Sequence, residues 1–130
     1  MLNKLTPLMK RTTEKEKKGW IIMVSSMEGQ FYRNKTTHHP HTNSAKAALN
    51  MLVRTSAPYY EREYKILMNS VDTGWVTDEY PVSYFPDRES NPPIDEIDGA
   101  SRILDPIFQS IINNKDEYGL FYKDYSPTEW

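Results

Sequence analysis

The chain has 130 residues and a formal net charge of −2, so it is long enough for one domain with a single core, and we expect one domain over residues 1–130. The slightly acidic balance argues against a nucleic-acid binder, which normally presents a basic face. The absence of cysteine excludes disulfides and thiol catalysis, and no stretch approaches the ~18 apolar residues of a membrane span. We therefore expect a cytoplasmic protein with neither a nucleic-acid nor a membrane partner.

The first two predicted elements are an interrupted helix and a buried strand. Helical spacing at the amino terminus is shown by Leu2, Leu5, Leu8 and Met9. Pro7 is expected to interrupt this helix, because proline removes an intrahelical hydrogen bond. The next run, Trp20–Val24, is continuously apolar, which predicts a strand that is buried on both faces.

A helix, a strand and a long loop are predicted next. The helix is indicated by the spacing of Ala45, Ala48, Leu49, Leu52 and Val53. Pro58 is expected to disturb it near its end. The second strand is Ile66–Val71, and the polar stretch after it contains scattered proline and Gly74, which predicts a loop.

The last helix and strand complete an alternating pattern. The helix is indicated by Ile94, Ile97, Ile103, Leu104, Ile107, Phe108 and Ile111, with Pro93 before its start and a possible kink at Pro106. Gly119–Tyr122 is the last strand. Helices that alternate with strands favour an α/β fold, here a partial doubly wound parallel sheet of about three strands with flanking helices. Ligands of such sheets lie beyond the carboxyl ends of the strands, so residues 25–29 and 72–77 form the predicted site.

Four segments resemble, in order, motifs of the short-chain dehydrogenase/reductase family. IIMVSSMEG resembles the strand and serine loop of that family, and SAKAALNML resembles the start of its active-site helix. MNSVDTGWV resembles the next strand and its nicotinamide loop, and GLFYKDY the last strand. The resemblance covers Ile21 to Tyr125. It implies the carboxy-terminal half of a Rossmann-like domain, ancestrally an NAD(P)-dependent oxidoreductase that interconverts small carbonyls and alcohols.

The resemblance assigns catalytic roles to two residues and leaves the proton donor open. Ser26 matches the serine that steadies the substrate carbonyl, and Lys46 matches the lysine of the YxxxK motif. Thr42 stands where that motif has its tyrosine, and an aliphatic hydroxyl is too weak an acid to replace a phenol. Imidazole as a chemical group can act as a general acid near neutral pH, so His41 is a candidate replacement, although it could also be a loop or helix-capping residue. Tyr32 is a second conceivable donor.

The resemblance also predicts how NAD or NADP would be held. Lys46 would hold the nicotinamide ribose, and the loop with Thr73, Gly74, Val76 and Thr77 would meet the carboxamide and a phosphate oxygen. The family opens with a glycine-rich pyrophosphate turn, but the five glycines of this sequence are scattered singly. The sequence thus resembles a truncated or degenerate member. The family's catalytic tetrad also includes an asparagine, and the resemblance does not assign that asparagine to Asn3.

Other interpretations of the sequence stay open. The chain could be a non-catalytic module that dimerises or binds a full-length relative, through the lysine-bearing helix and the helix before it. His38, His39 and His41 could suggest a metal site, but they crowd one loop without a fourth ligand. Glu28 and Asp72 flank the predicted pocket and are expected to be solvated or to cap helices. An unpaired edge on the strand Trp20–Val24 predicts an oligomer or an association with a relative.

Overall fold

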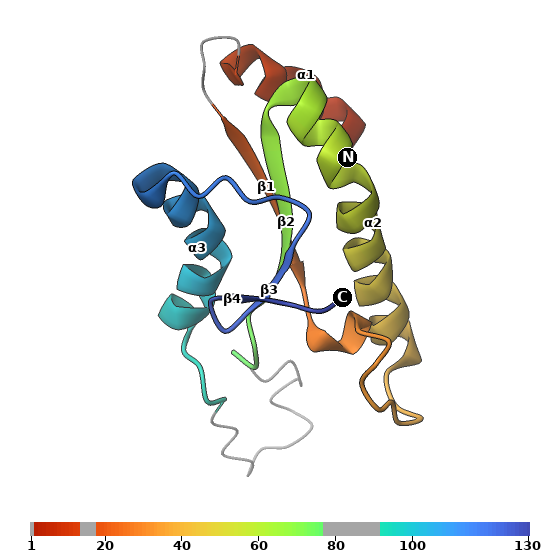
Figure 1. The fold of residues 1–130 in the computed structure, drawn as a ribbon. Helices are drawn as coiled ribbons and strands as arrows, with labels where there is room; N and C mark the ends of the chain where they lie inside the picture. Colours follow the sequence, from red (N-terminus) through yellow and green to blue (C-terminus); the bar gives the residue numbers. More distant parts are fainter. Residues whose placement is uncertain (1, 14–17, 77–91) are drawn as a thin grey trace.

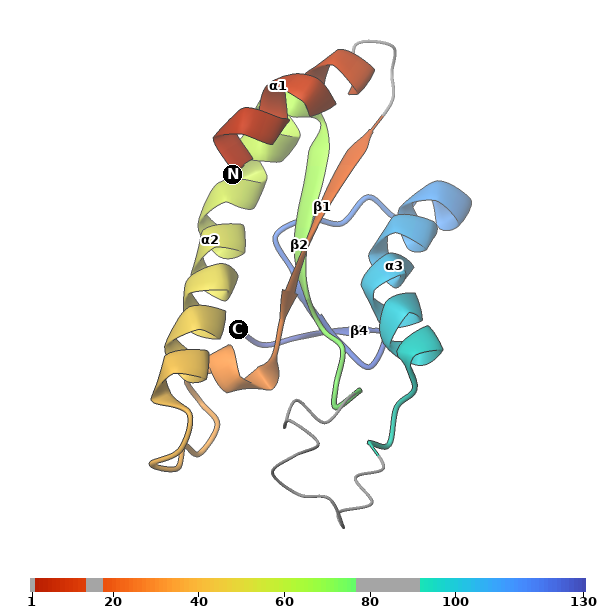
Figure 2. The same cartoon turned by 180° about the vertical axis from the view of Figure 1, so that it is seen from behind.

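The computed structural model describes residues 2–13, 18–76 and 92–130. In chain order its elements are α1 (Leu2–Thr13), β1 (Gly19–Ser25), the 3-10 helix η1 (Met27–Gly29), α2 (Pro40–Tyr64), β2 (Ile66–Asp72), α3 (Glu96–Asn113), β3 (Phe121–Lys123) and β4 (Ser126–Thr128). The strands form one sheet in the order β1-β2-β3-β4. Figures 1 and 2 show α1 and α2 on one face of the sheet and α3 on the other. The predicted α/β class is confirmed. None of the helices in the described ranges combines the length and apolarity that a membrane span needs.

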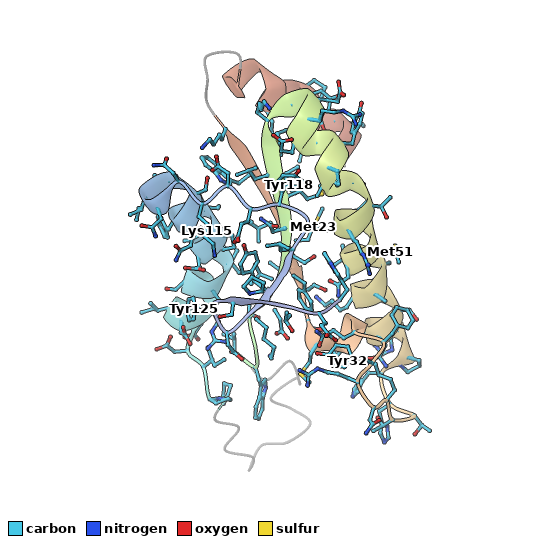
Figure 3. All side chains as sticks on the ribbon, viewed as in Figure 1. Met23, Tyr32, Met51, Lys115, Tyr118 and Tyr125 are labelled. Carbon is cyan, nitrogen blue, oxygen red and sulfur yellow. The ribbon has the colours of Figure 1, made fainter. Side chains whose placement is uncertain are left out.

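The core lies between β2 and α2. Every residue of β2 is buried, because this strand has a neighbour on each side and a helix over each face. Ile66 and Met68 point toward α2 and pack with Val53, Ala57 and Tyr60. Met23 of β1 lies against the same cluster (Figure 3). The core therefore fixes α2 across β1 and β2, and the start of α2 stands at the carboxyl ends of these strands.

The sheet differs from the prediction in two respects. Strands β1, β2 and β3 are parallel as predicted, but β4 adds an antiparallel edge that was not predicted. Its two-residue turn, Asp124-Tyr125, has positive φ at both positions without a glycine, so the usual hairpin signal is missing. The prediction that β1 is buried on both faces is wrong, because β1 is an outer strand and most of it is only half-buried, with Val24 exposed.

The helices run through prolines that were expected to interrupt them. Helix α1 continues past Pro7, and α2 continues past Pro58 as far as Tyr64. Losing one backbone hydrogen bond does not end α2, since Ala57 and Tyr60 on either side of Pro58 are held in the core. The buried face of α2 is also different from the predicted one. It consists of Asn50, Val53, Ala57 and Tyr60, and Ala45, Ala48 and Leu52 are exposed.

The buried Tyr122 makes the stability of the fold depend on pH in the alkaline range. Burial and the hydrogen bond that the Tyr122 hydroxyl donates to Glu117 at 2.6 Å raise the pKa of Tyr122 above its ordinary value. The folded state therefore favours the neutral phenol, and this contribution is complete below the unfolded pKa of about 10 and is lost as pH rises further. Urea unfolding should show a free energy that falls above about pH 10. The Tyr122→Phe variant should lose part of this fall; an identical pH profile for both proteins would contradict the assignment.

Candidate functional site

A cavity of about 870 Å³ opens where β1 and β2 end. Its wall is built from η1, the start of α2, the loop after β2, and β3. The cavity is lined by Ser26, His41, Thr42, Lys46, Thr73, Gly74 and Val76. Apart from the alternative donor Tyr32, these are all of the residues in the described ranges to which the resemblance assigned a catalytic or cofactor-binding position. Thr77 lies outside the described residues. The structure thus brings four separate sequence segments to one place, and the chemical role of each residue stays a prediction.

The serine loop and the lysine are joined by short polar contacts. Ser25 ends β1, is buried, and donates from its hydroxyl to the Lys46 carbonyl at 3.3 Å. Ser26 donates to a carboxylate oxygen of Glu28 at 3.3 Å. The Lys46 ammonium donates to the Val24 carbonyl at 3.2 Å, and its two other N–H groups give it capacity for another acceptor. Ser26, on the loop after β1, and Lys46, on α2, therefore bring a hydroxyl and an ammonium to the same part of the cavity.

Gly29 determines how closely η1 approaches α2. A Cβ at this position would lie 2.6 Å from the carbonyl carbon of Lys46 and 2.8 Å from the amide nitrogen of Ala47. Both are backbone atoms of α2, so they cannot move aside as a flexible side chain could. The absence of a side chain lets η1 rest directly on α2.

Gly29→Ala should therefore push η1 away from α2. We expect the free energy of unfolding to fall by about 1–3 kcal/mol, the usual cost of overpacking, as measured by urea denaturation. Ala48→Ser, on the exposed side of the same helix, should change it by less than about 0.5 kcal/mol. Equal stability of Gly29→Ala and the natural chain would show that this close approach is not needed.

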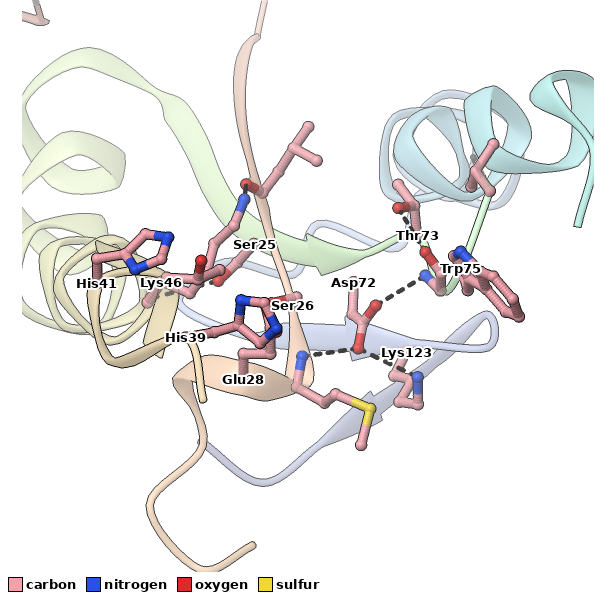
Figure 4. A pocket seen from close by; sticks show the side chains of 15 residues that line it. Ser25, Ser26, Glu28, His39, His41, Lys46, Asp72, Thr73, Trp75 and Lys123 are labelled. Atoms are coloured by element: carbon pink, nitrogen blue, oxygen red, sulfur yellow. Dashed lines mark hydrogen bonds and ion pairs between the residues drawn. The ribbon is translucent and has the colours of Figure 1, made fainter. Parts of the chain in front are cut away.

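Asp72 holds three parts of the site together and is not the solvated or capping residue that was expected. It is 2% exposed at the end of β2. Its carboxylate accepts hydrogen bonds from the backbone of Met27 at 2.8 Å and of Gly74 at 2.7 Å, and from the Lys123 ammonium at 3.1 Å. A carboxylate with these partners joins the serine loop, the loop after β2, and β3 (Figure 4).

The loop after β2 is shaped by its contacts with α3. Gly74 has a φ of +76°, and a Cβ there would lie 2.6 Å from Cδ1 of Ile94. Val76 packs against Gly99, where a Cβ would lie 2.8 Å from Cγ2 of Val76. Glycine at both positions lets the loop lie against Ile94 and α3, where residues 73–76 line the cavity.

Several cavity residues were not assigned there from the sequence. His39 lines the cavity with His41, and it is the N-cap of α2 in a left-handed conformation with a φ of 57°. Lys123 lines it too, and so does Trp75, which lies in the predicted range 72–77 but was given no role there. In Figure 4, His39, His41 and Lys46 lie on one side and Trp75 on the other. Lys123 directly follows the predicted last strand Gly119–Tyr122, so the rule that ligands lie beyond the carboxyl ends of the strands could have placed it here.

The structure bears on two other predictions for the loop before α2, a proton donor at Tyr32 and a metal site at the histidines. Tyr32 is 53% exposed and is not among the residues that line the cavity. In the described part of the chain, no three His, Cys, Asp or Glu side chains are grouped so that they could hold a metal ion. The polar side chains that line the cavity carry hydroxyls, imidazoles, carboxylates and ammonium groups.

Comparisons with known proteins agree with this fold. No family model matches the chain. The chain is 43% identical over 97 residues to an uncharacterized protein of Acanthamoeba polyphaga mimivirus, which covers 68% of this chain and 21% of the relative. The chain thus spans about a fifth of the length of this curated relative. A crystal structure of NADPH-bound carbonyl reductase from chicken fatty liver superposes on 99% of this chain and 51% of that chain, with a TM-score of 0.65 and 20% identity.

These findings define the class of fold. The mostly parallel sheet and its flanking helices are Rossmann-like, as in that carbonyl reductase. The similar structure therefore confirms the predicted α/β, Rossmann-like fold. At this level of identity the likeness concerns the fold, so the reaction and the cofactor have to be argued from the cavity itself.

Proposed function

We propose that this chain forms the substrate and nicotinamide side of an NAD(P)-dependent oxidoreductase that interconverts a small carbonyl and an alcohol. The observation that carries the proposal is the single cavity shared by Ser26, Lys46, the imidazoles of α2 and the loop 73–76. These groups come from segments far apart in the sequence. The similar carbonyl reductase is an NADPH-bound protein with the same fold, which supports the choice of cofactor.

The cavity residues have complementary roles in this reaction. The Ser26 hydroxyl donates a hydrogen bond to the substrate oxygen, which leaves Glu28 to accept from another donor. The Lys46 ammonium binds a ribose hydroxyl with an N–H that Val24 does not use. An imidazole at the start of α2, assigned to His41, gives the proton to the developing alkoxide, because imidazole is the side-chain group most often used as a general acid. Thr42 contributes a hydroxyl to the wall.

The lining fits the nicotinamide end of the cofactor better than the pyrophosphate. Lys46 and Thr73 supply an ammonium and a hydroxyl, and the glycine turn at Gly74 brings backbone close to the cavity. When bound, the nicotinamide supplies or accepts the hydride. A pyrophosphate is normally held by a glycine-rich turn at a helix N-terminus, and the five glycines of these 130 residues are scattered singly.

The 130-residue chain alone should therefore bind NADPH weakly. We expect a Kd of about 1 mM or weaker, which corresponds to about −4 kcal/mol, in a titration that follows NADPH fluorescence. NADP⁺ and NAD⁺ should compete for the same site. A Kd in the low micromolar range would contradict this distribution of binding groups, because it would require a pyrophosphate site within the chain.

A second candidate function is that of an interaction module that joins a relative or another copy. The observation that favours it is the position of β1, an outer strand whose second edge has no neighbouring strand in the described ranges. Trp20–Val24 carries no charge, proline or glycine that would discourage pairing. Saturable NADPH binding supports the first function; self-association without cofactor binding supports the second.

A further inference from the structure

Lys123 brings an ammonium group to the cavity that the proposed function does not use. The residue ends β3, the strand beside β2, and lines the cavity. Its ammonium donates one hydrogen bond, to Oδ2 of Asp72 at 3.1 Å, and no other residue in the described ranges accepts from this side chain. An ammonium has three N–H donors. Lys123 therefore has N–H groups available to a ligand in the cavity.

The ion pair between Lys123 and Asp72 exposes its positive partner. The side chain of Lys123 is 21% exposed and that of Asp72 only 3%. The carboxylate also accepts from the backbone amides of Met27 and Gly74, and hydrogen bonds of this kind help to stabilise its negative charge. The carboxylate is thus the buried and fully bonded member of the pair. A ligand that approaches the pair meets hydrogen-bond donors and a positive charge.

The second carboxylate of the cavity lies away from Lys123. The carboxylate of Glu28 accepts a hydrogen bond from Ser26 at 3.3 Å. In Figure 4, Glu28 lies beside His39, whereas Lys123 lies on the far side of Asp72. An anionic group bound at Lys123 would therefore not lie next to Glu28, and the cavity has an acidic and a basic end.

Lys123 is within reach of a ligand that is bound to Ser26. The Lys123 ammonium and the Met27 amide donate to the same oxygen of Asp72, at 3.1 and 2.8 Å. Two donors on one oxygen lie roughly 5 Å apart, and Ser26 directly precedes Met27 in the chain. A chain of roughly two or three carbon atoms would therefore connect an oxygen held by Ser26 to an anionic group held by Lys123.

We propose that Lys123 binds a carboxylate of the carbonyl substrate, so that the substrates are short keto acids. This inference rests on the proposed function for the role of Ser26. Carboxylate and phosphate both offer anionic oxygens, but phosphate sites are normally built from free backbone N–H groups. The amides of Met27 and Gly74 beside Lys123 are already bonded to Asp72. A single ammonium that forms charge-assisted hydrogen bonds suits a carboxylate.

A titration of the 130-residue chain with matched ligands tests the charge requirement. The ligands are levulinate, its neutral amide levulinamide, and inorganic phosphate, and the readout is the NMR shifts of the Lys123 and Ser26 amides. Levulinate should bind saturably with a Kd on the order of millimolar, and levulinamide should bind at least about tenfold more weakly, because it lacks the charge. Equal binding of the two, or tighter binding of phosphate at Lys123, would overturn the proposal.

Two variants isolate the ammonium, since Lys123→Met alone would leave the buried Asp72 carboxylate without its partner. Asp72→Asn keeps the ammonium and removes the competing carboxylate, so it should bind levulinate at least as tightly as the natural chain. The double variant Asp72→Asn, Lys123→Met should bind at least about tenfold more weakly than Asp72→Asn. Circular dichroism checks that both variants fold. Equal affinity of the two variants for levulinate would overturn the proposal, and if either variant fails to fold, the comparison of levulinate with levulinamide decides it.

A titration with both ligands separates this inference from the proposed function. In the chain saturated with NADPH, levulinate should still shift the Lys123 amide, because the two ligands occupy different parts of the cavity. Displacement of NADPH by levulinate would overturn the inference, since the anion would then occupy the cofactor's place. NADPH shifts at Lys46 and Gly74 without a levulinate shift at Lys123 would overturn the inference and leave the proposed function intact. Levulinate shifts at Lys123 without any NADPH shift would support the carboxylate site and contradict the proposed cofactor.

Discussion

Replacing His41 with alanine is expected to lower kcat/KM for NADPH-dependent carbonyl reduction by about 10²–10⁴-fold, the usual contribution of a general acid. The imidazole lines the same cavity as Ser26 and Lys46, and imidazole is the side-chain group most often used as a general acid. The hydroxyl of Thr42, which stands in the position of the family's tyrosine, does not ionise near neutral pH. Steady-state turnover at millimolar NADPH is the measurement.

Two matched variants separate the candidate donors. Thr42→Val keeps the shape of the side chain and should change kcat/KM by less than about threefold, because it removes no general acid. His39→Ala tests the second imidazole of the cavity. If Thr42→Val abolishes turnover and His41→Ala leaves it intact, the assignment of the donor is wrong. If His39→Ala alone abolishes turnover, the imidazole donor is His39.

Replacing Asp72 with alanine is expected to lower the free energy of unfolding by about 3–5 kcal/mol, since it removes one partner of a buried ion pair. The change strands the Lys123 ammonium, whose side chain is 21% exposed, and leaves the amides of Met27 and Gly74 without their acceptor. Because small domains are stable by only about 5–15 kcal/mol, a large fraction of the variant should be unfolded in modest urea. Chemical denaturation followed by circular dichroism measures this.

The double variant Asp72→Asn, Lys123→Met serves as the control. It removes both charges, so it should recover part of the lost stability. Glu61→Ala breaks the exposed pair with Lys65 and should cost less than about 1 kcal/mol. A loss for Asp72→Ala no larger than that for Glu61→Ala would mean that Asp72 does not hold the site together.

The sequence was sufficient to predict the parallel part of the sheet and the edge of the sheet at which the cavity lies. The apolar run Trp20–Val24 and the mostly apolar segment Ile66–Val71 mark two strands that the structure contains. The alternation of strands with helical spacing then requires that the carboxyl ends of the strands share one edge. This places Ser26 and Gly74 beside one another, and the structure brings both to the same cavity.

The remaining features depend on contacts between distant residues. In the sequence, Asp72 has the pattern of a polar loop residue. Only the fold brings the amide of Met27 and the ammonium of Lys123 to it. The hairpin to β4 turns at Asp124-Tyr125 without glycine, and Tyr125 donates to Asp98 of α3, which lowers the pKa of Asp98. A turn held by such tertiary contacts carries no local signal.

The most direct test of the proposed site is an NMR titration of the 130-residue chain with NADPH to several millimolar, a range that matches the weak binding expected here. Saturable shifts should be confined to the amides of Ser26, Lys46, Gly74 and Val76 and their neighbours, and Lys46→Met should reduce them. The α3 amide of Phe108, on the far side of that helix, should not shift. Saturable shifts elsewhere, or no shift at the cavity, would contradict the account that this cavity binds the nicotinamide end of the cofactor.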